Sequence, residues 1–237
     1  MRTGLFALVV ALLLGGCSIL PESPRVALYT PPLQVPAAAG QQGVQWRLAL
    51  SRPAASGLLG GARILVHPVP TQIEVYPQAE WSAPPPELVG NALLHAFEGD
   101  ARVPALQRSS AGLGRDFELT TELRAFQLEL ANGPSGVVRI KANLLRQPDG
   151  RLVEGRLFEA VVPAEGEDVG AAVTALGAGL QQVLSEIVDW TVTRAEQDWQ
   201  RHADAKPTAD PISVEDHLAR CTVDADHCVG WRGAAIF

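Results

Sequence analysis

Three long runs of alternating apolar and polar residues constrain the fold of this chain of 237 residues more than any other feature. Turn residues around Gly133 and Gly150 separate the runs. Because the side chains of a β-strand alternate between its two faces, such runs joined by short turns predict an antiparallel meander with one buried face. In the first run the apolar phase slips near Arg124 and Ala125, which predicts a β-bulge. The runs cover residues 117–130, 138–144 and 152–162.

Shorter strands are predicted before the meander. Residues 44–50 alternate between polar and apolar side chains, and residues 63–70 form a β-branched run that prolines end. Residues 73–76 predict a further short strand. Together with the meander, these segments supply five or six strands to one sheet.

Two helices with an apolar face complete the expected domain. The first begins after Ser82, whose hydroxyl can cap it, and ends at Gly99. The second extends from about 168 to 199, with apolar residues at helical spacing. We therefore predict an α+β fold, with both helices packed on one face of a mostly antiparallel sheet. Three glycines inside the second helix should let it approach the sheet closely: Gly170, Gly177 and Gly179.

The first sixteen residues have the pattern of an export signal, because an apolar run too short to span a bilayer follows Arg2. The next feature is Leu-Gly-Gly-Cys at 14–17, which resembles the lipobox of bacterial lipoproteins, although alanine or serine is more usual where Gly15 stands. The resemblance implies cleavage before Cys17 and acylation of its thiol by chains such as palmitate. Two or three such chains anchor a protein stably. Ser18, in place of aspartate, implies sorting to the outer membrane, facing the periplasm. An ordinary signal peptide with an incidental cysteine is the alternative.

The segment after Cys17 is rich in proline, alanine, glycine and glutamine and has no sustained period. We interpret it as an extended tether, although residues 26–29 could form a short strand. The predicted division of the chain is a signal peptide (1–16), a lipidated tether (17–43), one domain (44–200) and a tail (201–237).

The composition and motifs restrict the possible functions. A hydrophobic content of 47% indicates a globular protein, and the net charge of -7 argues against nucleic-acid binding, which needs clustered cations. The sequence has no Gly-x-Ser-x-Gly, phosphate-loop or His-Glu-x-x-His motif. His67 and His95 are more easily explained by packing or a surface position than by catalysis. We expect a protein that is not an enzyme and has no cofactor or metal, with a periplasmic hydrolase as a less favoured alternative.

The tail contains Cys221 and Cys228, with His217 and His227 nearby. Two cysteines and two histidines could hold zinc. However, an exported protein meets an oxidising compartment, and lipidation of Cys17 leaves an even pair of cysteines. We therefore favour a disulfide between Cys221 and Cys228 over a metal site.

Aromatic residues mark a candidate docking surface. Tyr76 and Trp81 flank Pro77 beside a proline-rich bend, and aromatic side chains commonly anchor protein interfaces. The alternative is structural, with Trp81 fixing the start of the first helix and Trp190 filling the core. We favour the structural role for Trp81 and Trp190, whereas for Tyr76 both roles stay open.

Several short segments, taken in order, carry a resemblance to a known family: 46–48, 63–70, 73–76, 81, 122–126, 142–145, 150–153 and 186–190. Their sequence and spacing resemble the ABC-type transport auxiliary lipoprotein family, which includes the Pqi-type membrane-integrity lipoproteins. One departure lies at 71–74, where Thr-Gln-Ile-Glu replaces the Tyr-Leu-Asp-Arg-like stretch of many members.

The resemblance implies a non-catalytic accessory protein of a lipid-transport system. Such a protein would dock at the outer membrane on a Mce-domain lipid-binding protein, which works with an ABC permease and an ATPase. A homo-oligomer is also implied, because an exposed edge strand beside Trp46 could pair with a neighbour. A free-standing lipid-binding carrier is the alternative, and it would need a cavity lined by the inner face of the sheet.

Overall fold

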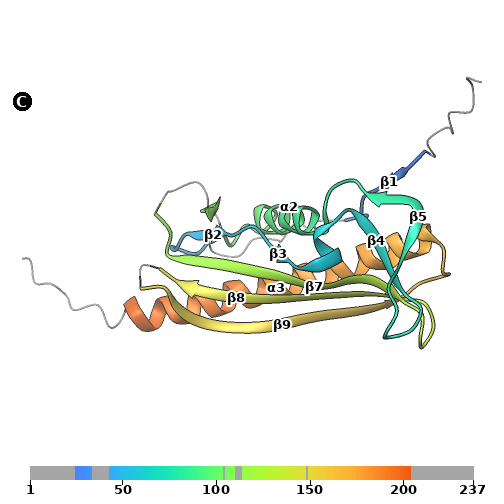
Figure 1. The fold of residues 1–237 in the computed structure, drawn as a ribbon. Helices are drawn as coiled ribbons and strands as arrows, with labels where there is room; N and C mark the ends of the chain where they lie inside the picture. The colour runs from blue at the N-terminus through green and yellow to red at the C-terminus, as the bar shows by residue number, and fades with distance from the viewer. Residues whose placement is uncertain (1–24, 34–42, 104, 110–113, 148, 204–237) are drawn as a thin grey trace, which may run out of the picture.

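The structure is a computed structural model that describes residues 25–33, 43–103, 105–109, 114–147 and 149–203. Within these residues the chain forms one nine-stranded sheet, two α-helices and a short 3-10 helix (Figure 1). The α+β prediction is therefore confirmed. In chain order the elements are β1 (Ala27–Tyr29), β2 (Leu48–Leu50), β3 (Ala54–Ala55), η1 (Gly57–Gly60), β4 (Arg63–His67), β5 (Glu74–Trp81), α2 (Pro85–Glu98), β6 (Leu106–Arg108), β7 (Phe117–Glu129), β8 (Ser135–Arg146), β9 (Arg151–Pro163) and α3 (Val169–Ala203).

The predicted meander is confirmed by β7, β8 and β9, which pair antiparallel along almost their full lengths. The predicted bulge is also present, since the register of β7 against β8 shifts between Leu123 and Ala125. Residues three apart on a regular strand lie on opposite faces. The bulge lets Leu123 and Phe126 both enter the core, where they are 1% and 0% exposed.

The rest of the sheet is mixed. Strands β2, β3 and β4 each pair parallel with β7, and β1 pairs parallel with β5. Parallel pairing needs a long crossover, which α2 supplies between β5 and β7. The long ladders are antiparallel, as expected, but the sheet has more than the predicted five or six strands. The additional strands β1, β3 and β6 contain only two or three residues each, too few for alternation to identify.

Part of the segment predicted to be a tether belongs to the sheet. Residues Ala27–Tyr29 pair with Ala79, Glu80 and Trp81 of β5, and Tyr29 and Leu33 pack against the core. The tether interpretation is therefore wrong for these residues. The structure shows the short strand that was left as the alternative for residues 26–29, and its partner strand lies 52 residues further along the chain, since Ala27 pairs with Ala79.

Strand β2 also differs from its prediction, because only Leu48–Leu50 of the run 44–50 are strand. It lies between β6 and β7, and Trp46 beside it is 0% exposed. The free edge expected next to Trp46 is therefore not there. A homo-oligomer built on that edge is not supported.

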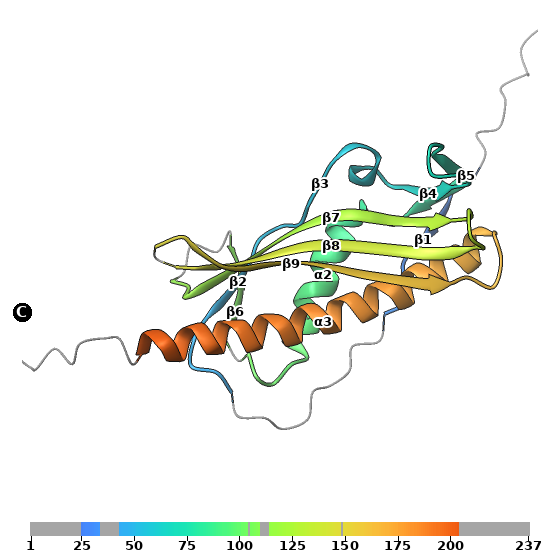
Figure 2. The same cartoon turned by 90° about the horizontal axis from the view of Figure 1, so that it is seen from below.

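Both helices pack on the same face of the sheet, as predicted. Figure 2 shows α3 extending along β8 and β9 while α2 lies across the strands. One core joins Phe97 of α2, Phe158 of β9 and Trp190 of α3. Helix α2 ends at Glu98 with Gly99 as its C-cap, as expected. Its N-cap is Pro84 and not Ser82, whose hydroxyl instead contacts that of Thr30 at 2.8 Å, so the capping prediction is wrong.

Helix α3 is long and apolar enough by composition to cross a membrane, but 61% of its most apolar window is buried inside the protein. It packs against β8 and β9, as the core helix of this domain. Of its glycines, Gly179 faces the sheet, where an added Cβ would lie 3.2 Å from Val138 Cγ2. Gly177 faces the N-terminal segment instead, where an added Cβ would lie 2.6 Å from Pro32 Cδ.

Candidate functional site

Trp81 lies in the core. It is the last residue of β5, is 1% exposed, and its ring centroid is 5.0 Å from that of Phe126. Its indole nitrogen has no hydrogen-bond partner in the described part of the chain. Trp81 thus presents no surface to a partner, in line with the structural role favoured from the sequence.

Tyr76 joins two elements that are far apart in the sequence. Its hydroxyl donates to the carbonyl oxygen of Glu167 at 2.5 Å, which ties β5 to the loop before α3. Burial, together with the nearby negative charges of Asp168 and Glu167, raises the pKa of Tyr76 to about 12. The phenol therefore stays a neutral donor at physiological pH.

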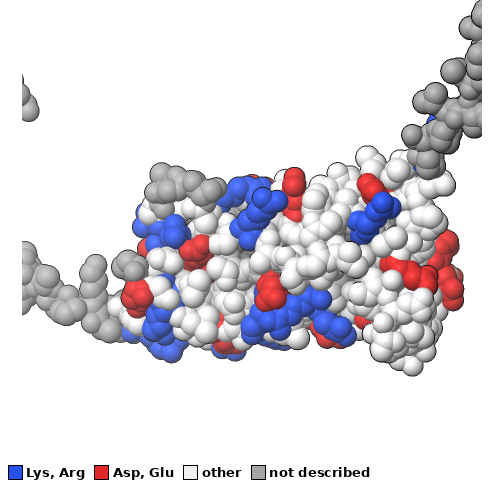
Figure 3. Space-filling view, viewed as in Figure 1, with Lys and Arg blue, Asp and Glu red and all other residues white. Residues whose placement is uncertain are grey.

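Exposed apolar side chains surround Tyr76 on the β4–β5 hairpin. Val69, Ile73 and Val75 are 44%, 50% and 40% exposed, and we call these three residues the hairpin patch. Figure 3 shows acidic side chains gathered at this end of the molecule, where β5 and the start of α3 lie. Apolar side chains bordered by charge are typical of a protein-docking surface. Residues 71–74, where the family pattern differs, belong to the same hairpin.

The predicted cysteine sites lie outside the described residues. Lipidation of Cys17 and the disulfide between Cys221 and Cys228 therefore stay predictions, as does the choice between that disulfide and a zinc site with His217 and His227. Mass analysis without reductant would identify the bond.

His67 and His95, the two histidines considered as catalytic candidates, lie on different elements. His67 ends β4 and is partly buried, whereas His95 is exposed on α2 with Nδ1 3.1 Å from Glu98 Oε2. Among the residues that the structure describes, no group of three or more His, Cys, Asp or Glu side chains could hold a metal ion.

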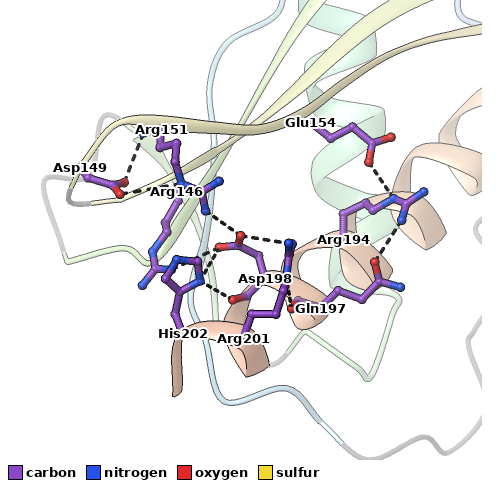
Figure 4. Close-up of polar contacts among 9 residues, drawn as sticks. All are labelled: Arg146, Asp149, Arg151, Glu154, Arg194, Gln197, Asp198, Arg201 and His202. Atoms are coloured by element: carbon purple, nitrogen blue, oxygen red, sulfur yellow. Dashed lines mark hydrogen bonds and ion pairs between the residues drawn. The ribbon is translucent and has the colours of Figure 1, made fainter. Parts of the chain in front are cut away.

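A cluster of arginines surrounds Asp198 near the end of α3 (Figure 4). The Asp198 side chain is 1% exposed and lies 3.4 Å from Arg146 of β8, 2.7 Å from Arg151 of β9 and 3.5 Å from Arg201. The cluster therefore fastens the last turns of α3 to the turn between β8 and β9. Nothing in the local sequence signals it, because its members come from three separate elements.

A second charged cluster fastens the middle of α3. Arg102 binds Asp100 through its side chain and reaches Asp189 of α3 at 2.6 Å. Hydrogen bonds from Arg102 hold the pKa of Asp100 below its ordinary value, against the opposing effect of burial. Both clusters are explained by the attachment of α3. Other exposed large apolar side chains lie on β1 and β9, and the hairpin patch is the candidate docking surface because Tyr76 fixes the hairpin that carries it.

Comparisons with known proteins agree with this architecture. A protein of Xanthomonas campestris, XCC0632, from the family DUF330, has a solved structure that superposes with a TM-score of 0.69 at 29% identity, covering 74% of this chain and 99% of that one. The crystal structure of a second, uncharacterized protein gives a TM-score of 0.56 at 18% identity over 70% of this chain and 98% of the other, and this supports the fold alone.

Sequence comparison adds a relative and a family. An uncharacterized protein of Bradyrhizobium diazoefficiens is 27% identical over 146 residues, which are 61% of this chain but 39% of that protein. The chain therefore matches well under half the length of this relative. The family model of the ABC-type transport auxiliary lipoprotein component matches residues 28–188, from β1 into α3. Since this match covers more than half of the chain, the protein belongs to the ABC-type transport auxiliary lipoprotein component family.

Proposed function

We propose that this protein is a lipid-anchored, non-catalytic accessory subunit of a Mce-type ABC transporter, which moves lipid across the envelope and supports membrane integrity. The family match over residues 28–188 carries the proposal. The lipobox-like residues 14–17 support attachment through acyl chains on Cys17, and Ser18 supports the periplasmic face of the outer membrane as the location.

The hairpin patch is the proposed contact with the Mce-domain protein. Its three exposed side chains stand on a hairpin that Tyr76 holds against the loop before α3. A hairpin fixed at its base can present apolar side chains without the entropic cost of ordering a flexible loop. Tyr76 thus holds the hairpin that carries the docking surface in place.

The packing of the inner face argues against a free-standing lipid carrier. A carrier would need space for acyl chains beneath the sheet, but side chains of both helices occupy that face. Phe97, Leu176 and Ile187 are each 0% exposed there. Lipid could enter only if a helix moved away from the sheet, at the cost of this apolar burial.

Crosslinking in intact envelopes tests the proposal. The full-length lipoprotein, purified by affinity after gentle crosslinking, should bring a Mce-domain protein with its permease and ATPase. Ile73→Asp should reduce that recovery at least tenfold, because a buried interface does not accept an unpaired carboxylate. Leu152→Asp is the matched control, since Leu152 is 52% exposed and Ile73 50%, and it lies at the opposite end of the sheet.

The outcomes separate the alternatives. Recovery of the protein alone with stoichiometric lipid would refute the accessory role in favour of a carrier. Equal recovery of the Mce-domain protein by the two aspartate variants would refute the hairpin patch as the contact.

Replacement of the predicted lipidation site tests the anchor. Cys17→Ala should release the protein into the soluble periplasm and abolish function in cells, while the circular dichroism of the domain stays unchanged. A variant that still fractionates with the outer membrane would contradict the anchoring mechanism.

A further inference from the structure

A groove of about 510 Å³ lies between the β2–β6 edge of the sheet and the first half of α2. Its apolar lining comes from Leu50, Pro53 and Pro86, and its charged lining from Arg52, Arg108 and Glu87. The groove therefore carries an excess of positive charge, although the whole chain has a net charge of -7. Figure 3 shows blue side chains gathered beside the position of α2.

The two arginines of this groove differ from most others in the domain. In the part of the chain that the structure describes, ten arginines form an ion pair with a carboxylate, whereas Arg52 and Arg108 do not. Arg108 uses one amino group on Asn91 Oδ1 of α2, at 3.1 Å, which leaves its other donors free. Two guanidinium groups with unused donors thus share one concave surface.

A hydrogen-bond network next to the groove fixes the backbone that carries these arginines. The carboxylate of Glu118 accepts hydrogen bonds from the hydroxyls of Ser51 and Ser109, each at 2.5 Å. Ser51 directly precedes Arg52, and Ser109 directly follows Arg108. Both serine hydroxyls turn toward Glu118, and Ser109 also lines the groove beside Arg108.

The charge of Glu118 is compensated within that network. Arg115 lies 3.1 Å from its carboxylate, and the serine hydrogen bonds together with Arg115 outweigh burial to hold the pKa of Glu118 below its ordinary value. Glu118 therefore places no uncompensated carboxylate beneath Arg52 and Arg108, and Glu87 of α2 is the one acidic residue among the described residues that line the groove.

We propose that this groove binds a phosphate group through Arg52 and Arg108, with Leu50 and the proline rings contacting the organic part of the ligand. Guanidinium groups present several N–H donors in one plane, which matches the oxygens of a phosphate better than an ammonium does. A phosphate ester fits the mixed lining, since the apolar residues have no role in binding the bare ion. The inference is independent of the proposed transporter role.

Titration calorimetry on the full mature lipoprotein in a non-ionic detergent tests the proposal. The probes are inorganic phosphate, glycerol 3-phosphate and the soluble lipid dihexanoylphosphatidylglycerol. The double variant R52Q/R108Q should bind each ester at least about tenfold more weakly, because it removes two charge-assisted contacts. The control K141Q/R156Q removes the same charge from two residues that also lack an ion pair in the described part of the chain. Its affinity for each ester should be within about twofold of that of the unchanged protein. Thermal melting establishes that both variants are folded.

The result also identifies the source of the phosphate. Binding of the lipid at least about tenfold more tightly than glycerol 3-phosphate would assign the groove to a lipid headgroup, whereas equal affinities would assign it to a free phosphate ester. Absence of binding by the unchanged protein would overturn the proposal, as would equal weakening in the two double variants. Tighter binding of an aspartate-rich peptide through the same arginines would overturn it in favour of a carboxylate ligand.

Discussion

Two glycines at the contact between α3 and β8 should respond in opposite ways to the same substitution. Gly136 of β8 lies against the backbone of α3, where an added Cβ would be 2.8 Å from the carbonyl carbon of Ala175 and 2.9 Å from the nitrogen of Leu176. Gly179 of α3 faces the end of a side chain instead, with Val138 Cγ2 at 3.2 Å from the added Cβ.

The expected changes in the free energy of unfolding depend on which atoms have to move to make room for the added methyl group. In Gly136→Ala the helix backbone has to retreat by roughly 0.6 Å to restore ordinary contacts, and overpacking of this kind costs about 1–3 kcal/mol. The gain of about 0.5–1 kcal/mol from removing a strand glycine offsets part of this. We expect a net loss of about 1 kcal/mol. In Gly179→Ala a methyl group has to shift by a few tenths of an ångström, while a helix gains about 1 kcal/mol from the replacement.

Urea unfolding, followed by tryptophan fluorescence, measures both effects. Gly136→Ala should lower the free energy of unfolding by about 1 kcal/mol, whereas Gly179→Ala should leave it unchanged or raise it slightly. The reasoning would be refuted by a Gly136→Ala variant as stable as the unchanged protein, or by Gly179→Ala as the more damaging of the two.

Three further predictions concern polar contacts. Asp198→Asn should lower the free energy of unfolding in urea by about 2 kcal/mol, because the surrounding arginines lose the negative charge that they bind. The control Asp149→Asn, at a side chain that is 54% exposed, should lower it by less than about 0.5 kcal/mol. Tyr76→Phe should cost about 1 kcal/mol and speed hydrogen exchange in the loop before α3; unchanged exchange would contradict the role of the hydroxyl. The pKa of Asp100 is lower in the folded protein than in the unfolded chain, where it is near 4. The ion pair with Arg102 therefore stabilises the fold fully above about pH 4, and this contribution is lost as the pH falls through the pKa of the folded state. The stability difference between the unchanged protein and Asp100→Asn should therefore be largest near pH 7 and shrink in acid, and a difference independent of pH would count against the ion pair.

The features that the sequence predicted correctly depend on local periodicity. The meander, the bulge after Leu123 and the end of α2 at Gly99 each follow from residues within a few positions of one another. A period of two fixes which face of a strand is buried, and a slip in that period marks a bulge. These signals need no knowledge of the rest of the chain.

The features that were missed, or kept only as a less favoured alternative, depend on partners far away in the sequence. Ala27–Tyr29 becomes a strand only because β5 offers an edge, and β4 runs parallel to β7 only because α2 carries the chain across. The role of Asp198 could not be predicted either, because only the folded structure brings Arg146 and Arg151 of the sheet next to it. At Ser82 a local signal was misleading, because this residue suits a helix N-cap but its hydroxyl contacts that of Thr30 instead.

The pairing of β1 changes how far the domain can lie from the membrane. A tether from Cys17 to Val44 would reach about 95 Å when fully extended, at roughly 3.5 Å for each residue. Since Ala27 is already paired with β5, only the ten residues after Cys17 remain, and they reach about 35 Å at most. If Cys17 is lipidated as proposed, the β1 end of the sheet is held close to the bilayer. Because β5, the partner strand of β1, also belongs to the hairpin that carries the hairpin patch, a protein that docks there as proposed would lie close to the membrane surface.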